Sequence, residues 1–289
     1  MRNVIVILFT VILVRCSFAQ QPPGSDIYLL DITAVKKKSL TFRNPVNITN
    51  RPGYDNQPGF HPDLPYVYYA SANEQGRTEI MQYDYQRNVT RQLTETPERE
   101  YSPTVTPDKK FFSCIIQRDN NAQDFGKYPV NGGQAEVIID NLIVGYHAWF
   151  DENNILLFVL GQPNTLRWYS SVDKHDKILR ENIGRSLHKI PGENAVSFVE
   201  KGKGEWTIKK VKANGSIEII APTLPGREDL TWTPDGKILM SDGEQLFYWL
   251  PGKSKSWEPL MWPEGFRPKG ITRLAVNASG TKLALVVSE

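Results

Sequence analysis

The stretch Leu230-Thr231-Trp232-Thr233-Pro234-Asp235-Gly236-Lys237-Ile238-Leu239-Met240 predicts a strand, a tight turn and a second strand. Pro234 fixes φ at the first corner of the turn, Asp235 hydrogen-bonds its own backbone, and Gly236 accepts the positive φ that the turn requires. Five other segments repeat this pattern of strand, polar turn and apolar strand. The six turns lie near residues 62, 107, 151, 191, 234 and 278.

This recurrence indicates the fold class. Repeats of about 40–45 residues, each with several short strands, are typical of the blades of a β-propeller. Asn-Gly and Gly-Gly steps within 131–133 and 214–215 mark hairpins between outer strands. Unrelated hairpins would not recur in register along the chain. The sequence therefore predicts an all-β protein, with a single six-bladed β-propeller of four-stranded antiparallel blades over residues 20–289.

The two ends of the repeat array fit each other. Two strands, near 27–31 and 40–49, precede the first complete repeat, and the last repeat supplies two strands between 271 and 287. The N-terminal strands therefore provide the half that the last blade lacks. We predict that they complete this blade and close the ring, which removes the free edges of an open array.

Residues 1–19 predict a signal peptide. A basic residue is followed by an apolar run from Val4 to Val14, and small residues stand before a cleavage point after Ala19. The apolar run is short for a bilayer span. We therefore expect a periplasmic or secreted protein with no membrane span after cleavage. A lipoprotein acylated at Cys16 is the alternative, which the preceding Arg15 disfavours.

Composition disfavours several classes of partner. The chain has 34 Lys and Arg against 32 Asp and Glu, and two of the basic residues belong to the signal peptide, so the mature chain is formally neutral. A neutral chain does not favour nucleic acid or an anionic membrane surface as the partner. Cys114 is the one cysteine left after cleavage, and its apolar neighbours indicate a buried thiol. We expect a monomer stabilised by core burial and ring closure.

The repeats resemble those of a known family. They are similar to the PD40, or WD40-like, repeat of TolB-type propellers, and to an exported branch of that superfamily in bacteria, in the segments Tyr54-Asp55-Asn56-Gln57-Pro58, Glu100-Tyr101-Ser102-Pro103, Gly145-Tyr146-His147-Ala148-Trp149 and Gly184-Arg185-Ser186-Leu187. The resemblance covers essentially all of the mature chain and implies the propeller fold. TolB carries a small α/β domain before its propeller, and no such domain fits ahead of Asp26, so the resemblance does not imply a Tol–Pal role.

Polar residues gather where the chain enters the inner strands of the predicted blades. These loops meet around one mouth of a propeller channel, and convergent polar groups in a concave site predict ligand binding. The alternative is that the same side chains cap strand ends and pair across blades without a ligand. The candidate ligand-binding residues are Asp55, Asn56, Gln57, Glu100, Tyr101, Ser102, Tyr146, His147, Arg185, Ser186, Glu228, Asp229 and Arg273.

The sequence favours an exported, non-catalytic propeller that binds a small molecule, or an envelope or extracellular protein, at this mouth. It has no Gly-x-Ser-x-Gly elbow, phosphate-binding loop or His-Glu-x-x-His motif. His147 beside Trp149 fits a packing residue better than a base. On this interpretation no cofactor is expected.

A metal-dependent hydrolase or lactonase that uses the same mouth is the alternative. Some six-bladed propellers hold a divalent cation on the channel axis through oxygen ligands. Asp55, Glu100 and Asp229 would supply hard oxygen ligands for calcium, with His147 as the base. Arginines at the same mouth would compete for these carboxylates, which favours the non-catalytic interpretation.

Arg185 distinguishes ligand binding from a structural role at the mouth. Its planar guanidinium either binds an anionic group of a ligand or ties neighbouring carboxylates, such as those of Glu228 and Asp229, together. The sequence leaves both possibilities open.

Overall fold

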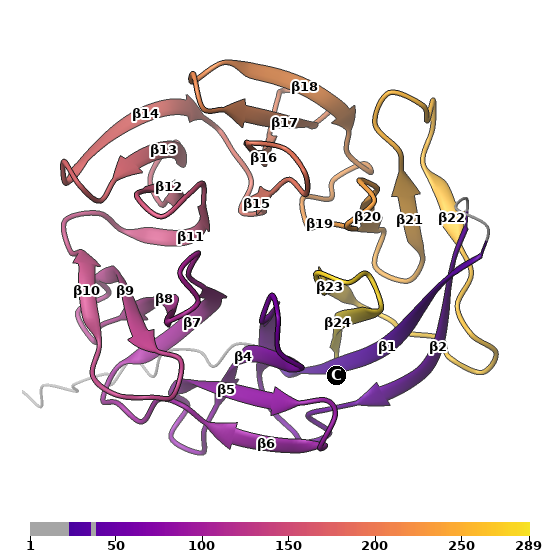
Figure 1. Ribbon diagram of the computed structural model, residues 1–289, viewed down its shortest axis with the longest axis horizontal. Coiled ribbons are helices and arrows are strands. Elements are labelled where there is room, and N and C mark those ends of the chain that lie inside the picture. Colours follow the sequence, from indigo (N-terminus) through magenta and orange to yellow (C-terminus); the bar gives the residue numbers. More distant parts are fainter. Residues whose placement is uncertain (1–22, 36–38) are drawn as a thin grey trace, which may run out of the picture.

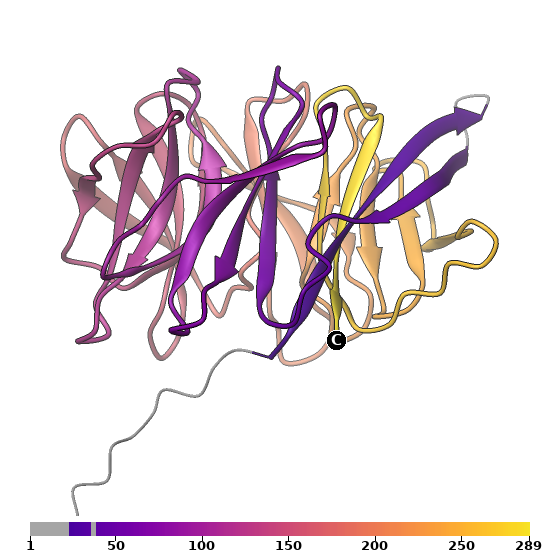
Figure 2. The same cartoon turned by 90° about the horizontal axis from the view of Figure 1, so that it is seen from below.

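The structure is a computed structural model that describes residues 23–35 and 39–289; the predicted signal peptide and Cys16 lie outside the described residues. The described residues form six four-stranded antiparallel sheets arranged in a ring (Figure 1). In side view the strands run between the two faces of the ring (Figure 2). The predicted six-bladed, all-β propeller is therefore confirmed. Within the described ranges, no helix is long and apolar enough to cross a membrane.

Blades one to five each consist of four consecutive strands, numbered from the channel outwards. Blade one contains β3 (Asp55–Phe60), β4 (Tyr66–Ala72), β5 (Thr78–Asp84) and β6 (Val89–Gln92). Blade two contains β7 (Arg99–Val105), β8 (Phe111–Gln117), β9 (Gln123–Pro129) and β10 (Glu136–Ile139). Blade three contains β11 (Val144–Trp149), β12 (Asn154–Val159), β13 (Thr165–Ser170) and β14 (His175–Glu181). Blade four contains β15 (His188–Lys189), β16 (Ala195–Glu200), β17 (Thr207–Lys212) and β18 (Ile217–Pro222). Blade five contains β19 (Leu230–Trp232), β20 (Ile238–Ser241), β21 (Leu246–Trp249) and β22 (Glu258–Leu260).

The sixth blade joins the two ends of the described chain. From the channel outwards it contains β23 (Ile271–Val276), β24 (Lys282–Ser288), β1 (Ser25–Val35) and β2 (Ser39–Asn47). β1 pairs antiparallel with β24, from Ser25 opposite Ser288 to Asp31 opposite Lys282. Buried leucines of both strands share one core cluster. The prediction that the N-terminal strands complete the last blade and close the ring is therefore confirmed.

The repeated turn holds each inner strand against the second strand of its blade. In blade five the Gly236 N–H donates to the Thr233 carbonyl, and Gly236 has a φ of +83°. The Thr233 hydroxyl donates to the Asp235 carboxylate at 2.6 Å. Blade two has the same bond, at 2.6 Å, between Thr106 and Asp108. The Thr-Pro-Asp sequence thus encodes the turn through its own side-chain hydrogen bonds.

Tryptophans link neighbouring blades. Trp149 Nε1 on β11 donates to Ser113 Oγ on β8 at 2.9 Å, and Trp232 Nε1 on β19 donates to Ser197 Oγ on β16 at 2.9 Å. In both pairs an inner strand contacts the second strand of the preceding blade. The two bonds therefore hold together blades two and three, and blades four and five.

Blades one and two approach each other closely near the channel. A Cβ atom at Gly59 would lie 2.6 Å from the Pro103 carbonyl oxygen, so only glycine fits this position without a shift of the backbone. Farther from the axis, Cys114 is fully buried beside Tyr68 and Phe112. Burial raises the pKa of its thiol well above the usual value. Cys114 therefore behaves as a small apolar core residue, as its neighbours predicted.

Removal of residues 26–49 should open the ring. The deletion takes away the partner of β24 and uncovers the core side chains Leu283 and Leu285, both fully buried. We expect an insoluble product, or one that trypsin cleaves far faster than the intact protein, because an exposed apolar strand edge promotes aggregation and local opening. A soluble truncated protein with an unchanged melting temperature would contradict closure by these strands.

A point substitution tests the same contact without removing backbone. Leu30→Ala should lower the free energy of unfolding by about 3 kcal/mol, because it leaves a cavity in a fully buried cluster. Thr33→Ala on the same strand is the control, since Thr33 is exposed. Urea unfolding measures both variants.

Candidate ligand site in the central channel

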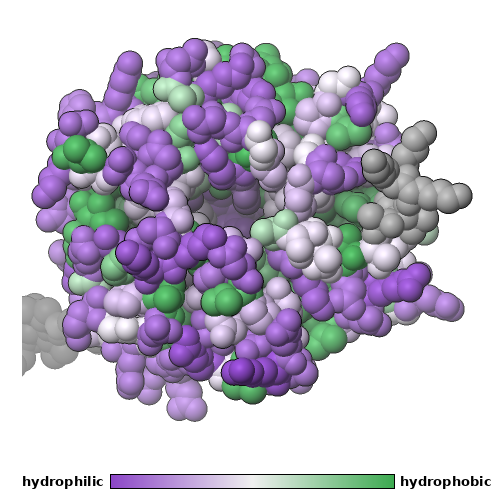
Figure 3. Space-filling model, viewed as in Figure 1, coloured by the Kyte–Doolittle hydropathy of each residue, from purple (hydrophilic) through white to green (hydrophobic). Residues whose placement is uncertain are grey.

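The six inner strands enclose a cavity of about 570 Å³ at the centre of the ring. Each of β3, β7, β11, β15, β19 and β23 contributes residues to its wall. The surface around the central opening is largely hydrophilic (Figure 3). A cavity of this size accommodates a small molecule.

The structure places eight of the thirteen predicted site residues in the cavity wall. Those in the wall are Gln57, Ser102, Tyr146, His147, Arg185, Ser186, Asp229 and Arg273. Those outside it are Asp55, Asn56, Glu100, Tyr101 and Glu228. The site therefore extends from the predicted mouth into the channel, and it does not include the first residues of β3 and of β7.

Backbone bulges explain why two buried acids lie elsewhere. In a regular strand, residues two positions apart share a face, but the registers of β3 and β7 shift after Asn56 and after Tyr101, so Asp55 and Glu100 do not face the channel with Gln57 and Ser102. Asp55 is fully buried and accepts a hydrogen bond from Arg51 at 2.8 Å. Glu100 is fully buried and accepts from the Thr96 and Tyr128 hydroxyls at 2.7 and 2.9 Å. Both carboxyls serve contacts within the protein.

The carboxylates of the metal-dependent alternative are not brought together. Asp55 contacts Arg51, Glu100 lies between blades, and Asp229 is held by arginines. Residues 23–35 and 39–289 contain no group of three or more His, Cys, Asp or Glu side chains arranged to hold a metal ion. The three predicted calcium ligands thus do not form one coordination site in this geometry.

Two arginines share one carboxylate at the mouth. Arg185 donates to Asp229 through Nε and Nη2 at 3.2 and 2.8 Å, and Arg273 donates to Asp229 at 2.7 Å. Arg273 also donates to the Tyr146 hydroxyl at 2.9 Å, and Glu228 accepts the Arg185 backbone N–H at 2.9 Å. Burial acts to lower the pKa of Arg185, but Asp229 raises it above the usual value. Arg185 therefore makes the carboxylate contacts that the structural alternative expects.

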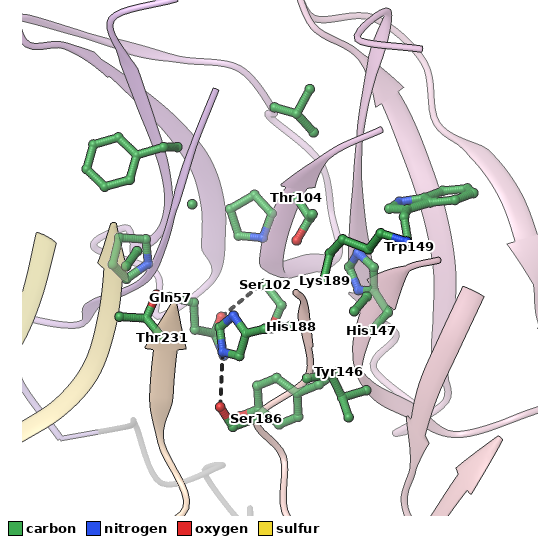
Figure 4. A pocket seen from close by; sticks show the side chains of 18 of the residues that line it. Gln57, Ser102, Thr104, Tyr146, His147, Trp149, Ser186, His188, Lys189 and Thr231 are labelled. Atoms are coloured by element: carbon green, nitrogen blue, oxygen red, sulfur yellow. Dashed lines mark hydrogen bonds between the residues drawn. The ribbon is translucent and has the colours of Figure 1, made fainter. Parts of the chain in front are cut away.

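Deeper in the channel, the wall carries polar side chains that were not among the predicted residues. Those labelled in Figure 4 are Thr104, His188, Lys189 and Thr231. Three of the four follow a predicted residue by two positions, as His188 follows Ser186, and so occupy the same face of the inner strand. Extending each predicted position along its strand in steps of two residues would have found these three.

Hydrogen bonds orient part of this polar wall. The Ser102 backbone N–H donates to Gln57 Oε1 at 2.8 Å, and Ser186 Oγ lies 3.0 Å from His188 Nε2 (Figure 4). The hydroxyls of Thr104 and Thr231 have no side-chain partner in the described part of the chain. Burial lowers the pKa of His188 to about 4, so its ring is neutral at pH 7. Below its charged mouth the channel thus presents uncharged hydrogen-bonding groups together with Lys189, whose ammonium donates to the Phe150 carbonyl at 2.7 Å.

His147 is a packing residue with one edge at the cavity wall. Its Nε2 lies 2.7 Å from Ser113 Oγ, and its ring centroid lies 4.5 Å from that of Phe125. Burial lowers the pKa of His147 to about 3, so it is neutral at physiological pH. This environment gives His147 the structural role that the sequence favoured and does not provide the exposed base of the hydrolase alternative.

The backbone is strained on one side of the mouth. Gln57 has a φ of +58° and Ser102 a φ of +55°, and the registers of β3 and β7 shift at these residues. A positive φ in a non-glycine residue costs on the order of 1 kcal/mol and is frequent at ligand sites. The bulges re-aim the side chains, so both residues reach the channel wall.

No family model matches the sequence, and no curated protein matches it. Solved structures do. A protein of Agrobacterium tumefaciens, provisionally described as TolB, has a TM-score of 0.69 at 14% identity over 93% of this chain and 99% of that chain. TolB of Acinetobacter baumannii has a TM-score of 0.59 at 14% identity, over 92% of this chain and 65% of its own.

A gluconolactonase of Xanthomonas campestris has a TM-score of 0.63 at 9% identity, over 95% of this chain and 100% of that chain. This chain therefore spans about two thirds of the A. baumannii TolB and all of the gluconolactonase. At these identities the likeness shows a TolB-like propeller fold and nothing about activity.

Arg185→Lys tests the structural role of the mouth network. Lysine replaces a two-pronged contact with a point charge, so we expect the free energy of unfolding to fall by about 1 kcal/mol, a value limited by the partial exposure of the pair. Arg180→Lys on β14 is the control, because its ion pair with Glu200 is long, at 3.7 Å. Equal stability of the two variants in low salt would contradict this role.

Glu100 should make stability depend on pH. Burial, reinforced by the charge of Glu79 and opposed by the hydrogen bond from Thr96, raises the pKa of Glu100 to about 7. The folded state therefore holds its proton more tightly than the unfolded state, and the free energy of unfolding should fall as pH rises from 4.5 to about 7. We expect a loss of about 3 kcal/mol from this group, because one pKa unit corresponds to about 1.4 kcal/mol.

Glu100→Gln is the matching variant. Its neutral amide keeps an acceptor for the Tyr128 hydroxyl and removes the titration, so its pH profile should be flatter between pH 5 and about 7, as measured by urea unfolding. Identical profiles for the variant and the native protein would contradict the assignment.

Proposed function

We propose that this protein is a non-catalytic binding propeller that takes a small polar ligand into its central channel. The observation that supports this most directly is the cavity of about 570 Å³ whose wall combines polar side chains from all six inner strands. Apolar residues, Leu274, Ala275 and Val276 among them, complete the wall. A mostly apolar pocket with a few convergent polar groups is the usual form of a small-molecule site.

The charges at the mouth favour a ligand that carries hydrogen-bond acceptors. Arg185, Arg273 and Lys201 pair with the two carboxylates of Asp229 and Glu228, which leaves one positive charge in excess within this network. Below it the hydroxyls of Thr104 and Thr231 have no partner in the described part of the chain. A polar organic molecule with an acceptor-rich end toward the mouth would satisfy both features.

The absence of catalysis is supported by how the wall residues are paired. A nucleophile and a base need a third group that orients the base. His188 contacts Ser186, but neither His188 nor His147 forms an ion pair with a carboxylate within the described residues. The Asp229 carboxylate at the mouth is held by two arginines, and that of Glu228 pairs with Lys201. We therefore assign Ser186 and His188 to ligand contact.

We also propose that the protein acts outside the cytoplasm, as an exported member of the TolB-like PD40 propellers. The supporting features are the signal-peptide pattern of residues 1–19 and the TolB-like fold. We propose that it works as a monomer without a nucleic-acid partner, in keeping with a formal net charge of only +2.

A channel-filling substitution tests the proposal. A library of small polar molecules is screened by ligand-observed NMR against the native protein and two variants. Thr104→Trp fills the channel, whereas Thr90→Trp adds the same side chain to an exposed position on β6. We expect compounds that bind the native protein and Thr90→Trp but not Thr104→Trp, with both variants folded by circular dichroism.

Equal binding to Thr104→Trp and the native protein would place the ligand outside the channel. If no small molecule binds and a peptide from an envelope or extracellular protein does, the occupant is a protein segment and the small-ligand proposal fails.

A further inference from the structure

A second cavity, of about 410 Å³, lies between blades one and two. Its wall comes from β4, β5, β6, the turn between β5 and β6, the turn after β3 and the turn after β9, and it shares no residue with the wall of the channel. We propose that this cavity is a separate site for a small organic carboxylate. The proposal rests on unpaired hydrogen-bond donors and does not depend on the function of the channel.

His61 supplies the first unpaired donor. Its side chain lies in the wall and is 6% exposed. Nδ1 accepts the backbone N–H groups of Asp63 and Leu64 at 3.1 and 3.0 Å, so the proton of the neutral ring is on Nε2. Burial also lowers the pKa of His61, which keeps the ring neutral. Nε2 has no partner among the described residues, so its N–H is free to donate to an acceptor in the cavity.

Tyrosines supply two more donors. Arg91 Nε donates to Gln82 Oε1, at 2.6 Å, and this fixes the amide so that Gln82 Nε2 donates to the Tyr68 hydroxyl oxygen at 3.0 Å. The oxygen of Tyr68 thus accepts, and its proton is left without an acceptor. Tyr66 has no hydrogen bond from its hydroxyl within the described chain. Three protons from His61, Tyr66 and Tyr68 therefore lack acceptors at this wall.

The charges of the wall also favour an anionic ligand with hydrogen-bond acceptors. Arg87 and Arg91 face a single acid, Asp84, whose Oδ1 already accepts two backbone N–H groups of the β5–β6 turn at 2.9 and 3.0 Å. Arg87 lies 3.8 Å from the other oxygen, and the terminal nitrogen of Arg91 reaches only the Val130 carbonyl, at 3.4 Å. Donors and positive charge are thus in excess, and the acceptor capacity is largely used.

These features together favour a carboxylate over other anions. A guanidinium binds carboxylate and phosphate alike through paired N–H groups. The wall also carries Leu64, Val89 and the rings of Tyr66 and Tyr68, which would pack against an organic body but gain nothing from inorganic phosphate. A monocarboxylate of about sugar size or aromatic-ring size therefore fits the chemistry best.

The test uses the full protein and defined probes. Benzoate and glucuronate are titrated and followed by saturation-transfer NMR, with benzamide and inorganic phosphate as comparison ligands. We expect at least one carboxylate to bind and both comparison ligands to fail. Arg91→Gln and His61→Asn should each weaken that binding about tenfold, because each removes a donor to the carboxylate. Asparagine at 61 keeps an acceptor for the turn N–H groups.

Controls separate this site from the channel and from loss of fold. Arg180→Gln on β14 makes the same charge change elsewhere, and Thr104→Trp fills the channel; both should bind the carboxylate like the native protein. In the native protein the ¹⁵N shift of His61 Nε2 should move on titration, which reads the site without substitution. The proposal fails if no carboxylate binds, if phosphate binds equally well, or if the His61 shift does not move.

Discussion

The antiparallel pairing of β1 with β24 is the contact on which the ring depends. Every other blade is made of consecutive strands, whereas this one joins residues 25–31 to 282–288 without a covalent link. The inner strand of the sixth blade, β23, contacts the inner strands of both the first and the fifth blade, so completion of this blade closes the ring around the channel. The positions of all six inner strands, and hence of the wall residues, follow from that closure.

Two kinds of polar contact divide the channel into a rigid mouth and a receptive interior. At the mouth, Asp229 is held by Arg185 and Arg273, and Tyr146 is held by Arg273, so residues of four blades are tied together around the opening. In the interior, Thr104 and Thr231 keep their hydroxyls without side-chain partners in the described chain. A mouth fixed by ion pairs above unpaired hydroxyls is the arrangement expected of a preorganised site, because a ligand then binds with little loss of side-chain entropy in the protein.

The fold was predictable because its signals are local and repeated. Thr233, Asp235 and Gly236 make the turn with their own hydrogen bonds and φ, and copies of that turn set the blade count. The site was predictable only in part. The bulge that turns Ser102 into the channel requires a positive φ that serine rarely adopts, and Arg273 meets Tyr146 across 127 residues of chain. Neither feature has a local sequence signal.

The lack of a local sequence signal for bulges also explains why a predicted site residue such as Glu100 lies outside the channel wall. Glu100 and Ser102 are two positions apart, and in a regular strand they would share a face. The register shift between Tyr101 and Thr104 breaks that relation, so Glu100 is buried between blades while Ser102 faces the channel. Bulges depend on the packing of neighbouring blades as well as on the strand itself, and periodicity alone does not locate them.

The burial of the Cys114 thiol slows its reaction with thiol reagents, and the rate of that reaction therefore reports on local opening of the structure. Its raised pKa and full burial keep the reactive thiolate scarce, so thiol reagents do not reach Cys114 while blades one and two are packed. Modification of Cys114 requires the cluster around Tyr68 and Phe112 to separate. The rate at which a thiol reagent labels Cys114 in the native protein therefore measures how often blades one and two separate locally. Thermal melting curves do not resolve this local fluctuation.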